Sequence, residues 1–143
     1  AEVRDSVLRT LFREELSEEA PFAESLYLNW DDARRMEAMG MVIGGHSHDH
    51  RPLGLLDRDT LTADLGRCAH ALDLRLGRRA GRPFCYPYGN AQAYNDDVVA
   101  TLKSLGFACA FTTHAGANSS HADPFRLQRI DCNDVPASPD PRP

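Results

Sequence analysis

The chain has 143 residues, of which 42% are hydrophobic and 26% are charged, and its formal net charge is −5. This length predicts one domain with a sizeable core, and the composition is that of an ordinary soluble globular protein. No cluster of Lys or Arg stands out, and no apolar run is long enough to span a bilayer. We therefore expect neither nucleic acid nor a membrane span.

The four cysteines are widely spaced and form no CxxC pair, and Cys85 and Cys109 lie between apolar neighbours. We interpret them as small buried residues with free thiols, which are typical of a reducing compartment. The N-terminal residues have no signal-peptide pattern, which together with the thiols favours a cytoplasmic location. They also lack an initiator methionine, so we expect the gene product to begin further upstream.

Taken in order, the chain begins with apolar residues at helical spacing, which predict an amphipathic helix over residues 3–16. Residues 17–25 are acidic, contain Pro21 and are expected to form a loop. Asn29 is then predicted to cap a helix that runs to about Met39, with Asp31 and Asp32 in its first turn.

The most informative stretch follows. The apolar residues 41–43 predict a short buried strand, two glycines end it, and the sequence His46-Ser47-His48-Asp49-His50 comes next. If residues 46–50 form a helical turn, His46 and His50 share one face, and two imidazoles placed so can bind one divalent cation, zinc above all. The alternative is a solvated loop whose histidines are surface groups or hydrogen bonders in the core.

The remaining elements are predicted from their caps and apolar periods. They are a helix at 58–76 after the cap Asp57, a strand at 83–86, a turn at 87–90, a helix from the cap Asn95 to Leu105, and strands at 107–112 and 126–131, with a polar loop at 113–124. Residues 135–143 contain four prolines and are predicted to be a disordered tail, which leaves residues 1–134 as the domain.

Strands that alternate with helices predict a parallel sheet with right-handed crossovers. In such sheets, functional groups gather at the C-terminal ends of the strands. Both unusual segments are predicted there: the histidine stretch after residues 41–43, and Pro87-Tyr88-Gly89 after residues 83–86. This coincidence favours a metal site over a surface loop.

Five segments in this order resemble the polysaccharide deacetylases, which include chitin, peptidoglycan and chitooligosaccharide deacetylases. They are residues 27–31, 40–50, 84–89, 106–113 and 126–131. The resemblance implies an α/β fold, namely part of a distorted (β/α) barrel with parallel strands and flanking helices. It also implies a metal-dependent carbohydrate deacetylase, a hydrolase that removes N- or O-acetyl groups from a polysaccharide or oligosaccharide.

By the same resemblance, His46 and His50 match the family's two metal-binding histidines, for zinc or another divalent transition metal such as cobalt or nickel. Tyr88 matches the tyrosine whose backbone N–H faces the oxyanion, and Tyr86, Pro87 and Gly89 shape the substrate-binding turn around it. The chemistry needs a metal to polarise the acetyl carbonyl and an amide to stabilise the tetrahedral oxyanion. Taken alone, Pro-Tyr-Gly would be an ordinary turn.

The sequence also departs from the family. It has no paired Asp on a first strand, where the family carries its general base and third metal ligand, and we interpret Asp31 and Asp32 as helix-capping residues instead. Cys85 or Tyr86 stands where the family has an arginine, and the family's late histidine motif is not recognisable. A closed barrel also needs about 200 residues or more.

We therefore expect the C-terminal two-thirds of a deacetylase domain, with weakened metal binding and little or no activity by itself. Asp49 and Asp131 are the candidates to stand in as general base. Self-association is expected to cover the missing strands. The alternative is a non-catalytic glycan- or metal-binding homologue, which the absence of the Asp pair would also explain.

Overall fold

The computed structural model describes residues 2–16 and 18–135, and the chain divides into two units, residues 1–40 and residues 41–143. The predicted disordered tail lies outside the described residues, except for Val135. Within the part that the structure describes, no helix is long and apolar enough to cross a membrane.

The first unit consists of three helices: α1 (Glu2–Glu15), α2 (Glu19–Leu26) and α3 (Trp30–Ala38). The helix predicted over residues 3–16 is confirmed as α1. The loop predicted for residues 17–25 is wrong, because α2 occupies most of it. Pro21 does not prevent this helix, since it lies in the first turn, where a backbone N–H has no partner within the helix.

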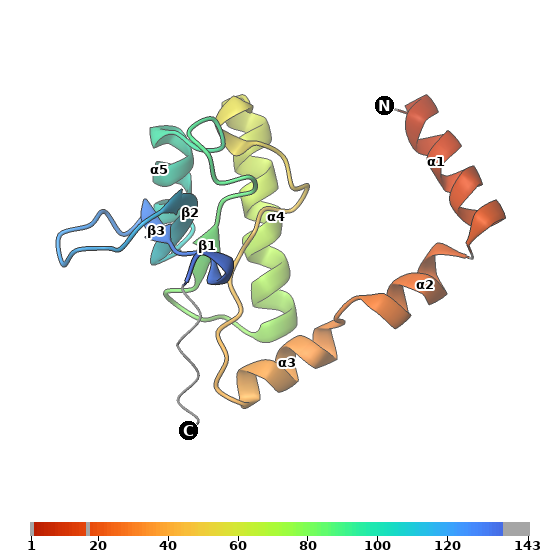
Figure 1. Cartoon of the computed structure of the whole chain (residues 1–143), viewed down its shortest axis with the longest axis horizontal. Coiled ribbons are helices and arrows are strands. Elements are labelled where there is room, and N and C mark those ends of the chain that lie inside the picture. The colour runs from red at the N-terminus through yellow and green to blue at the C-terminus, as the bar shows by residue number, and fades with distance from the viewer. Residues whose placement is uncertain (1, 17, 136–143) are drawn as a thin grey trace, which may run out of the picture. The chain divides into compact units, whose positions relative to one another are not determined.

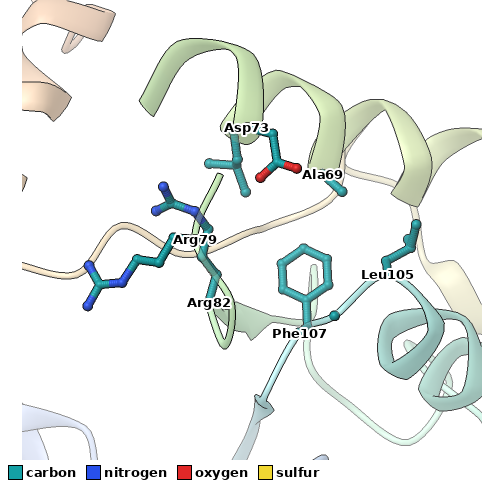
Figure 2. Close-up of a pocket in the computed structure, with 8 residues that line it drawn as sticks. Ala69, Asp73, Arg79, Arg82, Leu105 and Phe107 are labelled. Atoms are coloured by element: carbon teal, nitrogen blue, oxygen red, sulfur yellow. The ribbon is translucent and has the colours of Figure 1, made fainter. Parts of the chain in front are cut away.

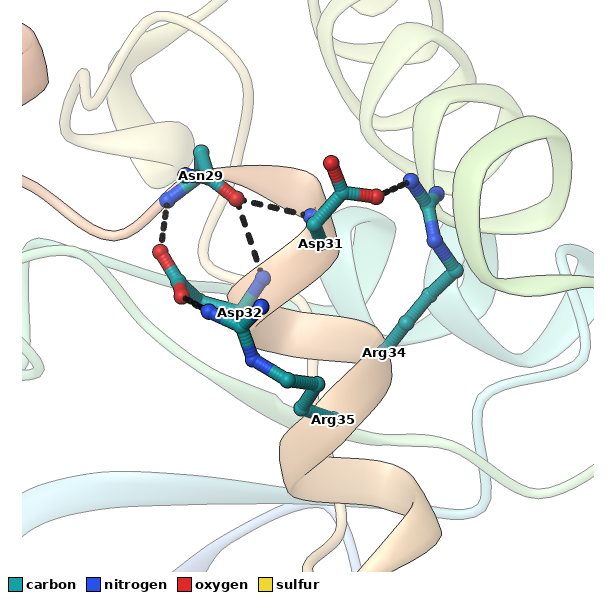
Figure 3. A network of polar contacts seen from close by, with 5 residues as sticks. All are labelled: Asn29, Asp31, Asp32, Arg34 and Arg35. Atoms are coloured by element: carbon teal, nitrogen blue, oxygen red, sulfur yellow. Dashed lines mark hydrogen bonds and ion pairs between the residues drawn. The ribbon is translucent and has the colours of Figure 1, made fainter.

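The cap of α3 is a network of side chains around Asn29 (Figure 3). The Asn29 side-chain oxygen accepts the N–H groups of Asp31 and Asp32 at 2.8 and 3.0 Å, and the Asp32 carboxylate accepts the Asn29 N–H at 3.0 Å. Arg34 and Arg35 pair with the two carboxylates. The Asn29 N–H lowers the pKa of Asp32. The interpretation as a capping residue is confirmed for Asp32, while Asp31 lies in the first turn and pairs with Arg34.

The second unit holds the sheet and the two longer helices that pack against it (Figure 1). Its elements are η1 (Leu53–Leu55), α4 (Arg58–Leu76), β1 (Pro83–Cys85), α5 (Asp96–Ser104), β2 (Cys109–Ala115), β3 (Leu127–Arg129) and η2 (Cys132–Asp134). The three strands lie side by side in the order β1-β2-β3 and all pair in parallel. The predicted parallel α/β arrangement is confirmed.

The core fills the space between the sheet and the two helices. Phe84 and Ala110 are fully buried on one face of the sheet, and residues of α4 and α5 pack against them. The helix α4 begins at the predicted cap, where the Asp57 carboxylate accepts the Thr60 N–H at 3.0 Å. Its buried stripe contains Leu61, Leu65, Cys68 and Leu72.

The predicted strand at residues 41–43 is wrong. Only Gly45 pairs with the sheet, in an isolated parallel bridge to Phe84, and Met41 and Val42 are exposed. The Gly45 N–H donates to Pro83 O at 2.9 Å. A Cβ atom on Gly44 would lie 2.6 Å from that same carbonyl oxygen, so the close approach occurs where the chain has only glycine.

The segment before the glycines is held by the buried Arg82. Its guanidinium donates to Ile43 O at 3.0 Å and to Gly77 O at 3.1 Å. Figure 2 shows this arginine beside a small cavity of about 30 Å³, between α4 and Phe107. Arg82 thus fixes residue 43 by one side-chain bond rather than by a strand ladder.

Candidate active site

The histidine stretch forms an irregular loop, not the helical turn that the spacing predicts. Ser47 and His50 have positive φ angles of 63° and 51°, and the His50 N–H donates to Ser47 Oγ at 2.8 Å. The two predicted ligands nevertheless meet: His46 Nε2 and His50 Nε2 are 3.1 Å apart, and the ring centroids are separated by 4.9 Å. The helical premise was wrong, although the structure brings the two rings together.

One hydrogen bond of His46 indicates its tautomer. Its Nδ1 lies 2.8 Å from Cys85 O at the end of β1. A carbonyl oxygen can only accept, so Nδ1 carries a hydrogen, and in the neutral ring the lone pair is on Nε2. A histidine that ligates a metal usually donates its other ring nitrogen to a carbonyl or carboxylate in this way. The contact of His46 with Cys85 O is therefore compatible with a ligand role for its Nε2.

The distance between the two Nε2 atoms fits a shared cation. Zinc binds imidazole nitrogen at about 2.0–2.1 Å, so two nitrogens on one tetrahedral ion lie about 3.3 Å apart. The observed 3.1 Å is close to that value. Within residues 2–16 and 18–135, no group of three or more His, Cys, Asp or Glu residues is arranged to hold a metal. The described residues thus offer two ligands of a tetrahedral set.

A strained turn lies next to this pair. The Gly89 N–H donates to Pro87 O at 2.8 Å, which closes a three-residue turn with Tyr88 at its centre and a φ of 63° there. Thr113 on β2 holds the turn, because its N–H donates to Gly89 O at 3.0 Å and its hydroxyl to Tyr88 O at 3.1 Å. The Tyr88 ring packs edge-on against His50, with centroids 5.1 Å apart.

The backbone N–H of Tyr88 makes no hydrogen bond to any residue that the structure describes. It is therefore available to an external acceptor beside the histidine pair. Ser47, His50 and Tyr88 are also the described non-glycine residues with positive φ. Backbone strain of this kind collects at functional sites, where it is part of the geometry that binding needs.

Tyr86 is a buried residue that precedes the turn and anchors this segment in the core. Its ring is buried and stacks on Tyr94 with centroids 4.4 Å apart, and its hydroxyl donates to Phe125 O at 2.8 Å. Burial raises the pKa of Tyr86. Pro87 is fully buried as well, whereas Tyr88 is 55% exposed. Tyr88 is therefore the member of the Tyr86–Gly89 segment whose side chain faces solvent most.

The two aspartates predicted as candidate bases already accept hydrogen bonds elsewhere. The Asp49 carboxylate lies 2.7 Å from His48 Nδ1 and 2.5 Å from the Arg67 guanidinium, and the bond from His48 lowers its pKa most. Asp131 caps η2, where the Asn133 N–H donates to it at 2.9 Å and lowers its pKa. Both stay predictions as catalytic groups.

Asp64 is a residue of this site that sequence reasoning missed. It lies on α4 with no exposed surface, and its two oxygens accept the N–H groups of His48 and Asp49, both at 3.0 Å. The sequence held a signal for it: Asp64 interrupts the apolar stripe of α4, three residues after Leu61 and next to Leu65. A carboxylate at a core-facing position needs a partner.

An open hollow of about 420 Å³ lies along the other face of the sheet. Because side chains alternate along a strand, Cys85 and Phe111 face away from the core that buries Phe84 and Ala110. The hollow is lined by Val42, Gly44, Gly45, His46, Pro83, Cys85, Phe111 and Arg129. Of the histidine pair, His46 lines this hollow.

The family model for polysaccharide deacetylases matches residues 10–110 of the chain. The chain belongs to the polysaccharide deacetylase family. The family recognised from the sequence segments is thereby confirmed. No curated protein sequence matches the chain.

The chain also matches solved structures, and two of the three named here are described as a deacetylase or a deacetylase domain. The chain matches the Streptococcus pyogenes deacetylase PplD, solved in complex with acetate, with a TM-score of 0.65 and 22% identity over 84% of this chain and 48% of PplD. It matches IcaB from Ammonifex degensii with a TM-score of 0.59 and 26% identity over 71% of this chain and 46% of IcaB. The corresponding values for the deacetylase domain of BpsB from Bordetella bronchiseptica are 0.62, 22%, 73% and 48%.

These matches confirm the predicted fold class, part of a deacetylase-type (β/α) barrel with parallel strands and flanking helices. The chain spans about half the length of each solved relative.

Proposed function

We propose that this chain carries the metal-binding and oxyanion-stabilising part of a carbohydrate deacetylase that acts on an acetylated polysaccharide or oligosaccharide. One observation carries the proposal. His46 is oriented by the Cys85 carbonyl so that its Nε2 lies 3.1 Å from His50 Nε2, directly beside the strained turn of Tyr88. Membership of the deacetylase family supports it.

His46 and His50 are the proposed ligands of zinc, or of another divalent transition metal such as cobalt or nickel. Neutral imidazole is a good ligand for each of these ions. Such an ion would supply Lewis-acid chemistry toward an acyl oxygen and would lower the pKa of water. The chain's contribution is to hold two imidazole Nε2 atoms toward one point, which His46 does through its bond to Cys85 O.

Tyr88 is the proposed oxyanion donor. Its N–H is fixed in direction because the turn is closed by Pro87 and Gly89 and tied to β2 through Thr113. Removing a preorganised donor of this kind typically costs about 2.7–4 kcal/mol of transition-state stabilisation. Tyr86, Pro87 and Gly89 would shape the wall against which the sugar lies.

The general base is the group of this site that the described residues supply least well. Asp49 and Asp131 remain the candidates, but hydrogen bonds lower the pKa of each carboxyl, and a good base has a pKa near the working pH. A missing base costs about 10²–10⁴ in rate. Because the chain spans about half of its solved relatives, we propose that it has little activity alone and that a longer form supplies the base.

A non-catalytic glycan- or metal-binding role is the second candidate. It is favoured by the fact that the described residues offer only two gathered ligands for a metal. Such a module would bind zinc and acetylated sugar and would release no acetate, whether or not the chain is extended upstream.

The metal part of the proposal is tested by measuring zinc binding. Isothermal titration calorimetry gives the affinity, and metal analysis of the purified protein gives the zinc content. We expect His46→Ala to lose most of the zinc that the wild type binds. The matched control is His48→Ala, which removes an imidazole from the same loop, but one that is bonded to Asp49 and not to the ring pair. Equal zinc binding in the wild type and in His46→Ala would rule the site out.

The catalytic part is tested by acetate release from acetylated chitooligosaccharide and acetylated xylan, with added zinc or cobalt. We expect a version extended upstream to release acetate and the 143-residue chain to release little. Zinc binding without acetate release in both would favour the binding module. Equal activity in both would show that the base lies within this chain, and Asp49→Asn and Asp131→Asn would then identify it.

A further inference from the structure

A buried carboxylate lies directly beneath the histidine loop. Asp64 on α4 has no exposed surface, and the bonds that satisfy it come from the N–H groups of His48 and Asp49, each at 3.0 Å. A buried charge is costly unless hydrogen bonds compensate for its lost hydration. Here the compensation comes from the loop, so the helix and the loop depend on each other.

The two amides that Asp64 binds lie between the two proposed ligands. His48 and Asp49 separate His46 from His50, and the flanking Ser47 and His50 have positive φ angles. Residues other than glycine disfavour that conformation, so a free loop would leave it. Fixing two consecutive amides to one carboxylate restrains the part of the backbone that sets the distance between the rings.

Neighbouring residues of α4 hold the rest of the loop. Arg67 pairs with the Asp49 carboxylate at 2.5 Å. Burial raises the pKa of the Cys68 thiol, and the backbone N–H groups of His46 and Ser47 oppose that rise. Asp64, Arg67 and Cys68 are three and four residues apart, so they share one face of the helix. This face contacts the loop at His48 and Asp49.

We propose that Asp64 is a positioning residue, which holds the backbone between His46 and His50 so that their Nε2 atoms converge before a cation binds. This inference rests on the proposed metal-binding role of the histidine pair. An apolar side chain at position 64 would complete the stripe of α4 but would leave the N–H groups of His48 and Asp49 without this acceptor. The Asp64 carboxylate therefore stabilises the loop, by accepting its N–H groups, and does not stabilise the helix.

The test compares two variants of the same helix in the full 143-residue chain. Asp64→Asn has nearly the same shape, but its amide group can accept from one N–H and opposes the other with a donor. The matched control is Asp57→Ala, which removes a carboxylate bond to the Thr60 N–H at the start of α4, away from the loop. Zinc affinity is measured by calorimetry, and amide hydrogen exchange is measured by NMR on the ion-free protein.

We expect Asp64→Asn to bind zinc about 10–100-fold more weakly than the wild type, as is typical when a group that orients a metal ligand is lost. In the ion-free protein, the amides of His48 and Asp49 should exchange faster in this variant. Asp57→Ala should lower the melting temperature and leave both zinc affinity and loop exchange as in the wild type. Unchanged affinity and unchanged loop exchange in Asp64→Asn would overturn the proposal.

Two further outcomes are distinguishable. If the wild type binds no zinc, the proposed function fails, whereas the ion-free exchange rates still decide whether Asp64 orders the loop. If Asp64→Asn does not fold, the wild type alone decides: slow exchange at both His48 and Asp49 supports the inference, and exchange as fast as in an exposed loop overturns it.

Discussion

The turn around Tyr88 depends on the absence of a side chain at Gly89, which leads to a testable prediction. Gly89 has a φ of 61°, and its N–H closes the turn onto Pro87 O. A Cβ atom at this position would lie 2.7 Å from Thr113 N and 2.7 Å from Thr113 Cγ2, about 0.7 Å closer than ordinary van der Waals contact. Gly89→Ala must therefore either move β2 or open the turn.

Two costs add. An alanine at this φ costs about 1–2 kcal/mol relative to its preferred conformations. Overpacking against a backbone that cannot move freely costs about 1–3 kcal/mol more. The sum of about 2–5 kcal/mol is a large part of a typical domain stability, and at about 4 °C for each kcal/mol it lowers the melting temperature by about 8–20 °C.

The matched control is Gly66→Ala in the middle of α4, where a Cβ atom would meet nothing within 4 Å. This change should raise stability by about 0.5–1 kcal/mol, because alanine is the better helix former. Thermal melts followed by circular dichroism compare the two variants with the wild type. A melting temperature of Gly89→Ala within about 2 °C of the wild type would show that the described turn is not formed.

Two further predictions follow from exposed and buried side chains. Burial raises the pKa of Tyr86 above its value of about 10 in the unfolded chain. As the pH rises above about 10, the unfolded chain therefore loses the Tyr86 proton before the folded protein does. The folded protein then loses stability relative to the unfolded chain. Urea melts from about pH 8 to about pH 11 should show the wild type losing stability relative to Tyr86→Phe, and a constant difference would contradict the argument. The apolar residues Val3, Val7, Leu8 and Leu11 of α1 are exposed, so we expect dimers or larger oligomers in light scattering; a monodisperse monomer would refute this.

The elements that were predicted well from the sequence are helices that begin at a clear capping residue. Asn29, Asp57 and Asn95 each accept a backbone N–H at the start of a helix, as predicted. A cap needs only its own first turn, so a short stretch of sequence contains the whole signal. The helix α2 was missed because Pro21 and a run of acidic residues were interpreted as a loop.

The segment at residues 41–43 shows the opposite case. Its apolar composition is typical of a strand, but a strand also needs a partner at hydrogen-bonding distance, and only Gly45 reaches one. No local pattern contains that information. Asp64 was missed for the same reason, because its partners lie 15 and 16 residues earlier in the chain. The pairing of His46 with His50 followed from their spacing, but the loop geometry behind it did not.

The two halves of the candidate site are held by different parts of the fold. The loop that contains His46 and His50 is fixed from α4, through Asp64, and from β1, through the Cys85 carbonyl. The turn of Tyr88 is fixed from β2, through Thr113. The His50 and Tyr88 rings are in contact where the halves meet.

This division has an energetic consequence. Three residues with positive φ lie on the two segments, so each segment holds a conformation that an isolated peptide would leave. The packing of α4, β1 and β2 supplies the free energy that keeps them there. A ligand that binds only the converged rings must in turn stabilise that packing, because binding to the folded state alone shifts the folding equilibrium. If a cation binds the converged rings, as proposed above, its binding and the stability of the α4 contact with the loop are therefore thermodynamically linked.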